Sequence, residues 1–141
     1  MISYCVVDSS LRQRLALVCV SLPLELAVLF GSRVSGRVHP SSDVDVGVLP
    51  LDRALSLHDE LSFAATLSTA ADAEVDLVRL DVDDALLGRE VARTAIALYE
   101  RTPGAFAAYR ARAMSVWVDM NETLEPHRAH LLRRLSTMAA R

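Results

Sequence analysis

Apolar residues recur along the chain with two different periods, and these periods predict where strands and helices lie. Short runs rich in Val, Leu and Ile, bounded by turn-forming residues, favour strands. They cover residues 24–30, 43–49, 73–80 and 96–100. Apolar residues repeated every three or four positions favour helices. Such segments cover about 10–20, 53–70 and 103–138, and a shorter one follows Asp83-Asp84 and ends near Thr94.

Residues that cap or break helices flank the predicted helices. The helix-starting candidates are, in chain order, Asp8-Ser9-Ser10, Pro50 with Asp52, Asp83-Asp84 and Pro103-Gly104. Pro23 ends the first helix. Pro126 is expected to bend or interrupt the last one, because proline lacks the backbone donor that a helix interior needs.

This order of elements predicts an α/β (α+β) fold, with a small mixed sheet flanked by helices and a helical C-terminal segment. The alternation is too irregular for a doubly wound parallel sheet, and no G-x-G-x-x-G turn is present. No repeat, low-complexity segment or linker divides the chain, so residues 1–141 are interpreted as one domain.

The C-terminal segment carries a long apolar stripe at helical spacing. Its members are Phe106, Tyr109, Ala113, Trp117, Met120, Leu124, Leu131 and Leu135. Two interpretations stay open: the stripe packs on the sheet, or it is a surface for a partner. The exposure of Tyr109 and Trp117 would distinguish them, because buried aromatic residues mark a core and exposed ones an interface.

Composition excludes several function classes. The apolar content of 52% in 141 residues supports a packed core and argues against a disordered protein. The net charge of −3 gives no indication of nucleic acid or an anionic membrane as the main partner. All 15 basic residues are Arg, which excludes chemistry that depends on a lysine.

Nothing in the sequence indicates export or membrane insertion. The N-terminus lacks a basic region of the signal-peptide type, and the apolar run 15–30 is interrupted by Pro23 and Glu25. Cys5 and Cys19 show no metal-binding spacing and are interpreted as buried thiols. We expect a cytoplasmic protein without a membrane partner.

Three carboxylates interrupt apolar strands. Asp43 and Asp45 lie two apart in DVDVGVLP, so they share one strand face while the valines between and after them share the other. Asp76 stands in the similar run EVDLV. One such acid could simply protect an edge strand, but three that converge need a cation, and oxygen-only ligands suit Mg²⁺ or Mn²⁺.

A phosphate-binding turn precedes these acids. Gly31 follows the first predicted strand and lets the backbone approach a phosphate, and Ser32 adds a hydroxyl and an N–H. Ten residues then separate Ser32 from Asp43. Gly-Ser alone has no diagnostic value, so its meaning comes from this spacing.

GS, ten residues and DVD resemble the GSx10DxD signature of the polymerase-β-like nucleotidyltransferase superfamily. Asp76 falls where that superfamily has its last catalytic carboxylate, so the resemblance covers a catalytic core of about residues 24–80. The short chain is similar to the minimal nucleotidyltransferase (MNT) group, many of whose members are antitoxins of HEPN-domain RNase toxins. The segment LYERTPGAFAAYR also resembles that group.

The resemblance implies a role for each residue of the signature. Gly31 and Ser32, with Arg33 and Arg37 as further candidates, would hold the phosphates of ATP. Asp43 and Asp45 would bind metal, and Asp76 would complete a second metal site and help to deprotonate the attacking hydroxyl. The implied reaction is AMP transfer with release of pyrophosphate.

The resemblance leaves the acceptor open. In the MNT group it implies a tyrosine of the cognate HEPN toxin, with antitoxin and toxin in one hetero-oligomer. One alternative is an antitoxin that acts by occupancy without required catalysis. Another is an aminoglycoside-type enzyme, although such enzymes generally need a second domain or a dimer to build the sugar site.

Overall fold

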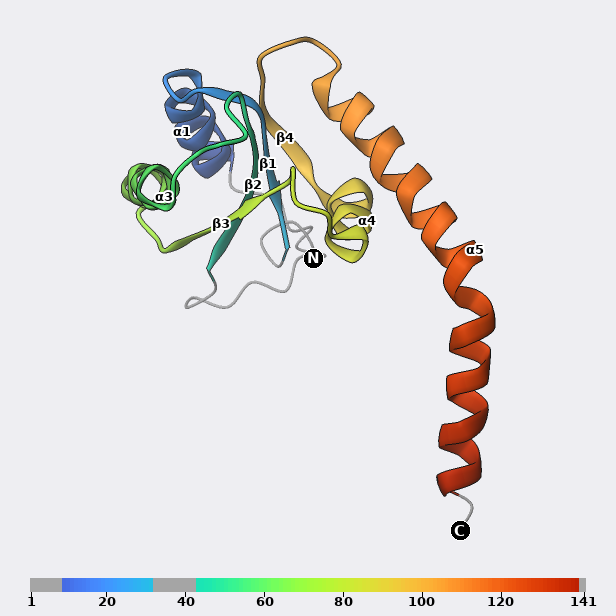
Figure 1. Ribbon diagram of the computed structural model, residues 1–141. Coiled ribbons are helices and arrows are strands. Elements are labelled where there is room, and N and C mark those ends of the chain that lie inside the picture. The colour runs from blue at the N-terminus through green and yellow to red at the C-terminus, as the bar shows by residue number, and fades with distance from the viewer. Residues whose placement is uncertain (1–8, 32–42, 140–141) are drawn as a thin grey trace, which may run out of the picture.

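The computed structural model describes residues 9–31 and 43–139, with only the backbone for 122–125 and 127. The elements run in the order α1 (Ser9–Val20), β1 (Leu24–Phe30), β2 (Val44–Pro50), α3 (Leu57–Ala71), β3 (Val75–Arg79), α4 (Ala85–Thr94), β4 (Ile96–Glu100) and α5 (Ala105–Ala139) (Figure 1). The four predicted strands are confirmed, with ends that differ by at most two residues.

The four strands form one mixed sheet in the order β3-β2-β1-β4. β1 pairs antiparallel with both β2 and β4. β2 and β3 run parallel, and α3 makes the crossover that a parallel pair requires. The expected small mixed sheet flanked by helices is therefore confirmed.

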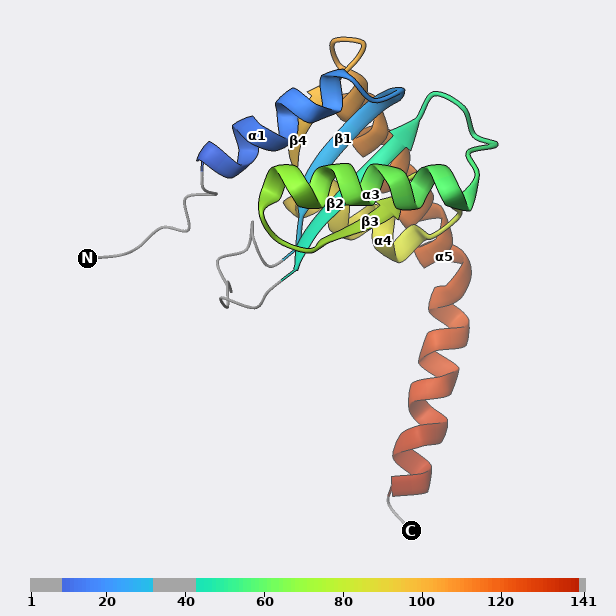
Figure 2. The same ribbon diagram turned by 90° about the vertical axis from the view of Figure 1, so that its left-hand side faces the viewer.

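Helices cover both faces of the sheet (Figures 1 and 2). On one face α1 and α3 contribute Leu11, Leu15, Leu67 and Ala71 to a core that includes Val44, Val46 and Val75. On the other face α4 and the start of α5 contribute Val91, Ala92, Tyr109 and Ala113 to a second core with Leu26, Val28 and Phe30. β1 is apolar almost throughout because it contributes to both cores.

The start of α3 differs from the prediction. A helix was expected from residue 53, but α3 begins at Leu57, and the Oγ of Ser56 accepts the backbone N–H of Asp59 at 3.1 Å as an N-cap. Leu57 and Leu61, two of the apolar residues at helical spacing in the predicted segment 53–70, are 70% and 62% exposed. The prediction was wrong here because a side chain from another strand holds residues 53–55 outside the helix.

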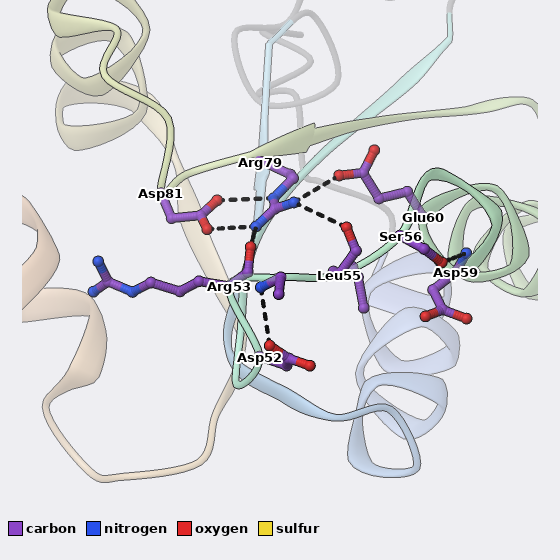
Figure 3. Close-up of polar contacts among 9 residues, drawn as sticks. Asp52, Arg53, Leu55, Ser56, Asp59, Glu60, Arg79 and Asp81 are labelled. Atoms are coloured by element: carbon purple, nitrogen blue, oxygen red, sulfur yellow. Dashed lines mark hydrogen bonds and ion pairs between the residues drawn. The ribbon is translucent and has the colours of Figure 1, made fainter.

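That side chain is Arg79, at the end of β3 (Figure 3). Its Nη2 and Nε donate to the two carboxylate oxygens of Asp81, at 2.6 and 2.9 Å, and its Nη1 donates to Glu60 at 3.0 Å. Arg79 also donates to the carbonyls of Arg53, at 2.8 Å, and Leu55, at 3.5 Å. The guanidinium thus ties the loop before α3 to the strand that carries Asp76.

α5 runs without interruption from Ala105 to Ala139 and contains Pro126, so a break at that proline is not found. Its first part packs on the second core, where Tyr109 is 7% exposed. Its last part extends away from the rest of the molecule (Figures 1 and 2). The apolar stripe therefore has two environments: its start is core, and Met120, Leu131 and Leu135 are exposed.

Two smaller predictions have clear outcomes. Cys19 is buried and unpaired, and burial raises the pKa of its thiol to about 11, whereas Cys5 lies outside the described residues. Trp117 is half-buried, and the guanidinium carbon of Arg89 lies 4.8 Å from the centre of its ring.

Within residues 9–31 and 43–139, no helix has the length and apolar character to cross a bilayer.

Candidate active site

Asp45 and Asp76 face each other across two parallel strands. They are register partners in the β2–β3 ladder, and neighbouring strands lie about 4.8 Å apart, so the two side chains leave the sheet side by side. Both point away from the core formed with α1 and α3, because Val44, Val46, Val75 and Leu77 belong to that core. The sheet therefore brings these two predicted site residues together on the α4–α5 side.

Asp45 is the more enclosed of the acids. Its partner on β1 is Phe30, which belongs to the second core, and Asp45 itself is half-buried, whereas Asp43 and Asp76 are exposed. Burial raises the pKa of the Asp45 carboxyl, and the negative charges of Asp76 and then Asp43 raise it further. Without a cation, its charged form is thus disfavoured by burial and by both neighbours.

Gly31 lies directly beside the Asp45 carboxylate. Its φ is +80°, and a Cβ built on it would overlap Oδ2 of Asp45 and lie 3.0 Å from the carboxyl carbon. Glycine is therefore favoured on two grounds: the left-handed backbone strains any other residue, and a side chain would have to displace the Asp45 carboxylate. The predicted phosphate-binding turn begins at the predicted metal-binding carboxylate.

Three further predicted residues lie outside the described part of the chain. They are Ser32, Arg33 and Arg37, within residues 32–42. Their roles stay predictions, as do those of the described acids and Gly31.

The donor set fits a hard divalent cation in its chemistry. Asp43, Asp45 and Asp76 supply only oxygen ligands, which Mg²⁺ and Mn²⁺ prefer. The Asp45 carboxyl, with a raised pKa and two acidic neighbours, is a group that a cation would stabilise in its charged form. Among the residues that the structure describes, however, no three His, Cys, Asp or Glu side chains are close enough to hold an ion together, so the expected convergence of all three acids is not found; the sheet places Asp45 and Asp76 side by side.

A separate hollow of about 220 Å³ lies at the other end of the same face. Its walls include Leu49 at the end of β2, Leu80 after β3, and Tyr109 and Arg112 of α5. Asp45 and Asp76 lie near the opposite strand ends and do not line it. The hollow is therefore distinct from the Asp45–Asp76 pair.

Sequence reasoning gave no role to Arg79 or to Phe30. Arg79 follows Asp76 on the same strand but points to the α3 side, where it binds Glu60. Its partners Glu60, Leu55 and Arg53 lie 19 to 26 residues away in the sequence, so the local pattern contained no signal for this network. Phe30 could have been found, since it immediately precedes the Gly-Ser turn at the end of an apolar strand.

The comparisons with known proteins agree with this geometry. The sequence profile of the family described as "Polymerase beta, Nucleotidyltransferase" matches residues 19–103, which include β1, Gly31 and the three acids. A search of curated protein sequences gives no significant match.

Several solved structures share the fold. A chain of a toxin–antitoxin complex with AMP-PNP superimposes with a TM-score of 0.73 at 24% identity, over 86% of this chain and 98% of that one. A chain of a toxin–antitoxin MntA–HepT complex gives 0.70 at 20% identity, over 89% and 99%. A chain of the tri-AMPylated Shewanella oneidensis HEPN toxin in complex with MNT antitoxin gives 0.65 at 22% identity, over 86% and 98%.

Proposed function

The chain belongs to the polymerase-β nucleotidyltransferase family, and from this membership we propose that it transfers AMP from ATP to a protein hydroxyl, acting as an antitoxin. The observation that carries the proposal is the position of Asp45. It stands in register with Asp76 and against Gly31, so a candidate metal ligand, a candidate base and the phosphate turn meet at one strand end.

The reaction balances as an in-line displacement. The acceptor oxygen forms a bond to the α-phosphorus of ATP, the bond from that phosphorus to the β-phosphate oxygen breaks, and pyrophosphate leaves. Asp76 is exposed, so an acceptor hydroxyl can come within hydrogen-bond distance of its carboxylate, which then takes the hydroxyl proton. Gly31 and Ser32 hold the β- and γ-phosphates.

Asp43 and Asp45, with Asp76, would hold one or two divalent ions. Bound there, Mg²⁺ would supply charge that stabilises the α-phosphate of the transferred AMP and the leaving pyrophosphate. The half-buried Asp45 would hold such an ion in a fixed position, because its strand is paired on both sides. Asp43, which is exposed and directly precedes β2, would complete the set from the solvent side when an ion is bound.

The acceptor we propose is a tyrosine of a HEPN-domain toxin. Two arguments support it. The three solved chains described above come from toxin–antitoxin complexes, one of which contains a tri-AMPylated HEPN toxin and an MNT antitoxin. In addition, α5 presents exposed apolar residues that a protein partner would cover. A reaction that consumes ATP to silence an RNase belongs in the cytoplasm.

The test is transfer of labelled AMP. The protein is incubated with α-³²P-ATP, Mg²⁺ and each purified HEPN-domain protein of the source organism, and label on the HEPN protein is followed together with pyrophosphate release. We expect label that a tyrosine-to-phenylalanine change in the acceptor removes. If the RNase is silenced without any label, neutralisation is by occupancy. Label on an aminoglycoside instead of a protein would show a small-molecule enzyme.

A further inference from the structure

The last turns of α5 have an exposed apolar face that no other part of the described chain covers. Leu131, Leu135 and Met138 are 57%, 52% and 70% exposed. They recur at spacings of four and three residues, so they lie on one side of the helix. Because this half of α5 extends away from the sheet, it contributes nothing to either core (Figures 1 and 2).

The same segment differs in charge from the rest of the chain. Four of the 15 arginines and none of the 18 acidic residues come after Glu125. At 100° per residue, Arg128 and Arg134 lie about 60° to either side of Leu131, so they flank the face formed by Leu131, Leu135 and Met138, and the exposed Leu132 lies beyond Arg128. Arg133 lies on the opposite side of the helix. The end of α5 is therefore a basic amphipathic helix attached to an acidic body.

We propose that residues 126–139 of α5 dock as an amphipathic helix in an apolar groove of the HEPN-domain toxin, with acidic residues along the groove that pair with Arg128 and Arg134. The proposal rests on the proposed antitoxin function and names the surface that serves it. Helix-in-groove recognition uses anchors spaced as Leu131, Leu135 and Met138 are spaced.

Charge favours this occupant over a second copy of the chain. Two such helices paired through their apolar faces would bring arginines together without a carboxylate on either segment. A membrane surface is also a poorer match, because residues 126–141 contain no Trp, Tyr or Phe to anchor at the interface. An acidic protein groove satisfies both the apolar face and the arginines.

The experiment compares three full-length variants. Leu131→Gln with Leu135→Gln removes the apolar anchors but keeps helix propensity. Arg128→Gln with Arg134→Gln removes the flanking charges. Arg133→Gln removes one charge from the opposite side and is the matched control. Because all five side chains are exposed, circular dichroism and the thermal melt should be unchanged in every variant.

Binding to each purified HEPN-domain protein of the source organism is measured by calorimetry at two salt concentrations. The leucine variant should bind at least about 30-fold more weakly, the effect of losing central anchors. The double arginine variant should bind more weakly and lose part of the salt dependence, and Arg133→Gln should match wild type.

Three results would overturn the docking proposal alone. The first is an unchanged affinity of the leucine variant for the HEPN protein. The second is self-association of wild type in sedimentation velocity that the leucine variant abolishes. The third is that the leucine variant loses binding to phosphatidylserine–phosphatidylcholine vesicles while its HEPN binding stays intact. The thermal shift with Mg-ATP reports on the proposed function separately. If wild type neither responds to Mg-ATP nor binds any HEPN protein, both proposals fail; if it responds to Mg-ATP but binds none, only the docking and acceptor assignments fail.

Discussion

The backbone of Gly31 touches the carboxylate of Asp45. Gly31 follows β1 and Asp45 stands near the start of β2, and the antiparallel pairing of these strands puts the two at the same sheet end. A Cβ on Gly31 would overlap Oδ2 of Asp45. The turn that would bind phosphate and the acid that would bind metal are therefore one structural unit.

Gly31→Ala should destabilise the protein by more than the backbone strain alone. A left-handed backbone costs an alanine about 1–2 kcal/mol, and the new Cβ must also displace the Asp45 carboxylate. Gly104→Ala is the matched control, since Gly104 has a φ of +89° but no atom within 4 Å of its added Cβ. Urea unfolding should show the larger loss for Gly31→Ala; equal losses would mean that the carboxylate moves freely.

Asp45→Asn should stabilise the protein without nucleotide above the pKa of Asp45. That pKa is raised in the folded state, so the folded form binds the proton more tightly than the unfolded form. The contribution of Asp45 to the stability of wild type is therefore most favourable below its unfolded pKa and is lost as pH rises through the folded value. Melts across pH should show the advantage of Asp45→Asn at neutral pH and its disappearance in acid.

Mg-ATP should reverse the order of stability of wild type and Asp45→Asn. A bound cation stabilises the charged Asp45, so wild type should gain melting temperature with Mg-ATP and Asp45→Asn should gain much less. Asp83→Asn, at an exposed acid away from the cluster, should behave as wild type in both experiments. If Asp45→Asn keeps the full thermal shift with Mg-ATP, Asp45 is not a ligand of the proposed metal site.

Apolar periodicity identified every strand because both faces of the sheet are covered, so strand residues are apolar and bounded by turns. It also put Asp45 and Asp76 on faces away from their neighbouring valines. Their register could not follow from the sequence alone, because a shift of one residue in the β2–β3 ladder would turn Asp76 away from Asp45. Strand order and register are properties of the whole sheet.

Long-range contacts explain the failed predictions. The start of α3 depends on Arg79, which lies 24 residues after Leu55 and binds its carbonyl. The stripe along α5 has uniform spacing, yet only its first turns meet α4 and the sheet. Local sequence pattern carries no information on where a helix leaves the body of the protein.

Arg79→Leu should destabilise the fold by about 2–4 kcal/mol, because Asp81 would lose a two-point ion pair while it stays 6% exposed at its side chain. Two loop carbonyls would lose their donor as well. Arg53→Gln is the control, since Arg53 contributes its backbone carbonyl to the network and its residue is exposed. Urea unfolding at neutral pH measures the stability of both variants. If Arg79→Leu and Arg53→Gln lose comparable free energy of unfolding, the contacts of Arg79 do not stabilise the loop before α3.

The Asp81 contribution should also depend on pH. Hydrogen bonding to Arg79 lowers the pKa of the Asp81 carboxyl. Its stabilising effect is therefore present above the unfolded pKa and is lost as pH falls through the folded value. The stability gap between wild type and Arg79→Leu should narrow in acid, and a gap that is constant with pH would assign the loss to packing instead of charge.

Asp76→Asn should separate nucleotide binding from transfer. Asp76 is exposed beside the more enclosed Asp45, a position from which it reaches an incoming acceptor hydroxyl. Removing a general base costs about 10²–10⁴-fold in rate, and the asparagine keeps the shape and the strand register. We therefore expect AMP transfer to fall by that factor while the Mg-ATP thermal shift stays measurable.

The control for this prediction is Asp72→Asn, measured in the same assay. Asp72 is exposed at the C-terminal end of α3 and has no proposed role in the site, so its substitution should leave transfer intact. Turnover of Asp76→Asn near that of wild type would show that this carboxylate only protects the edge of the sheet, where β3 lies, and the three-acid site would be wrong.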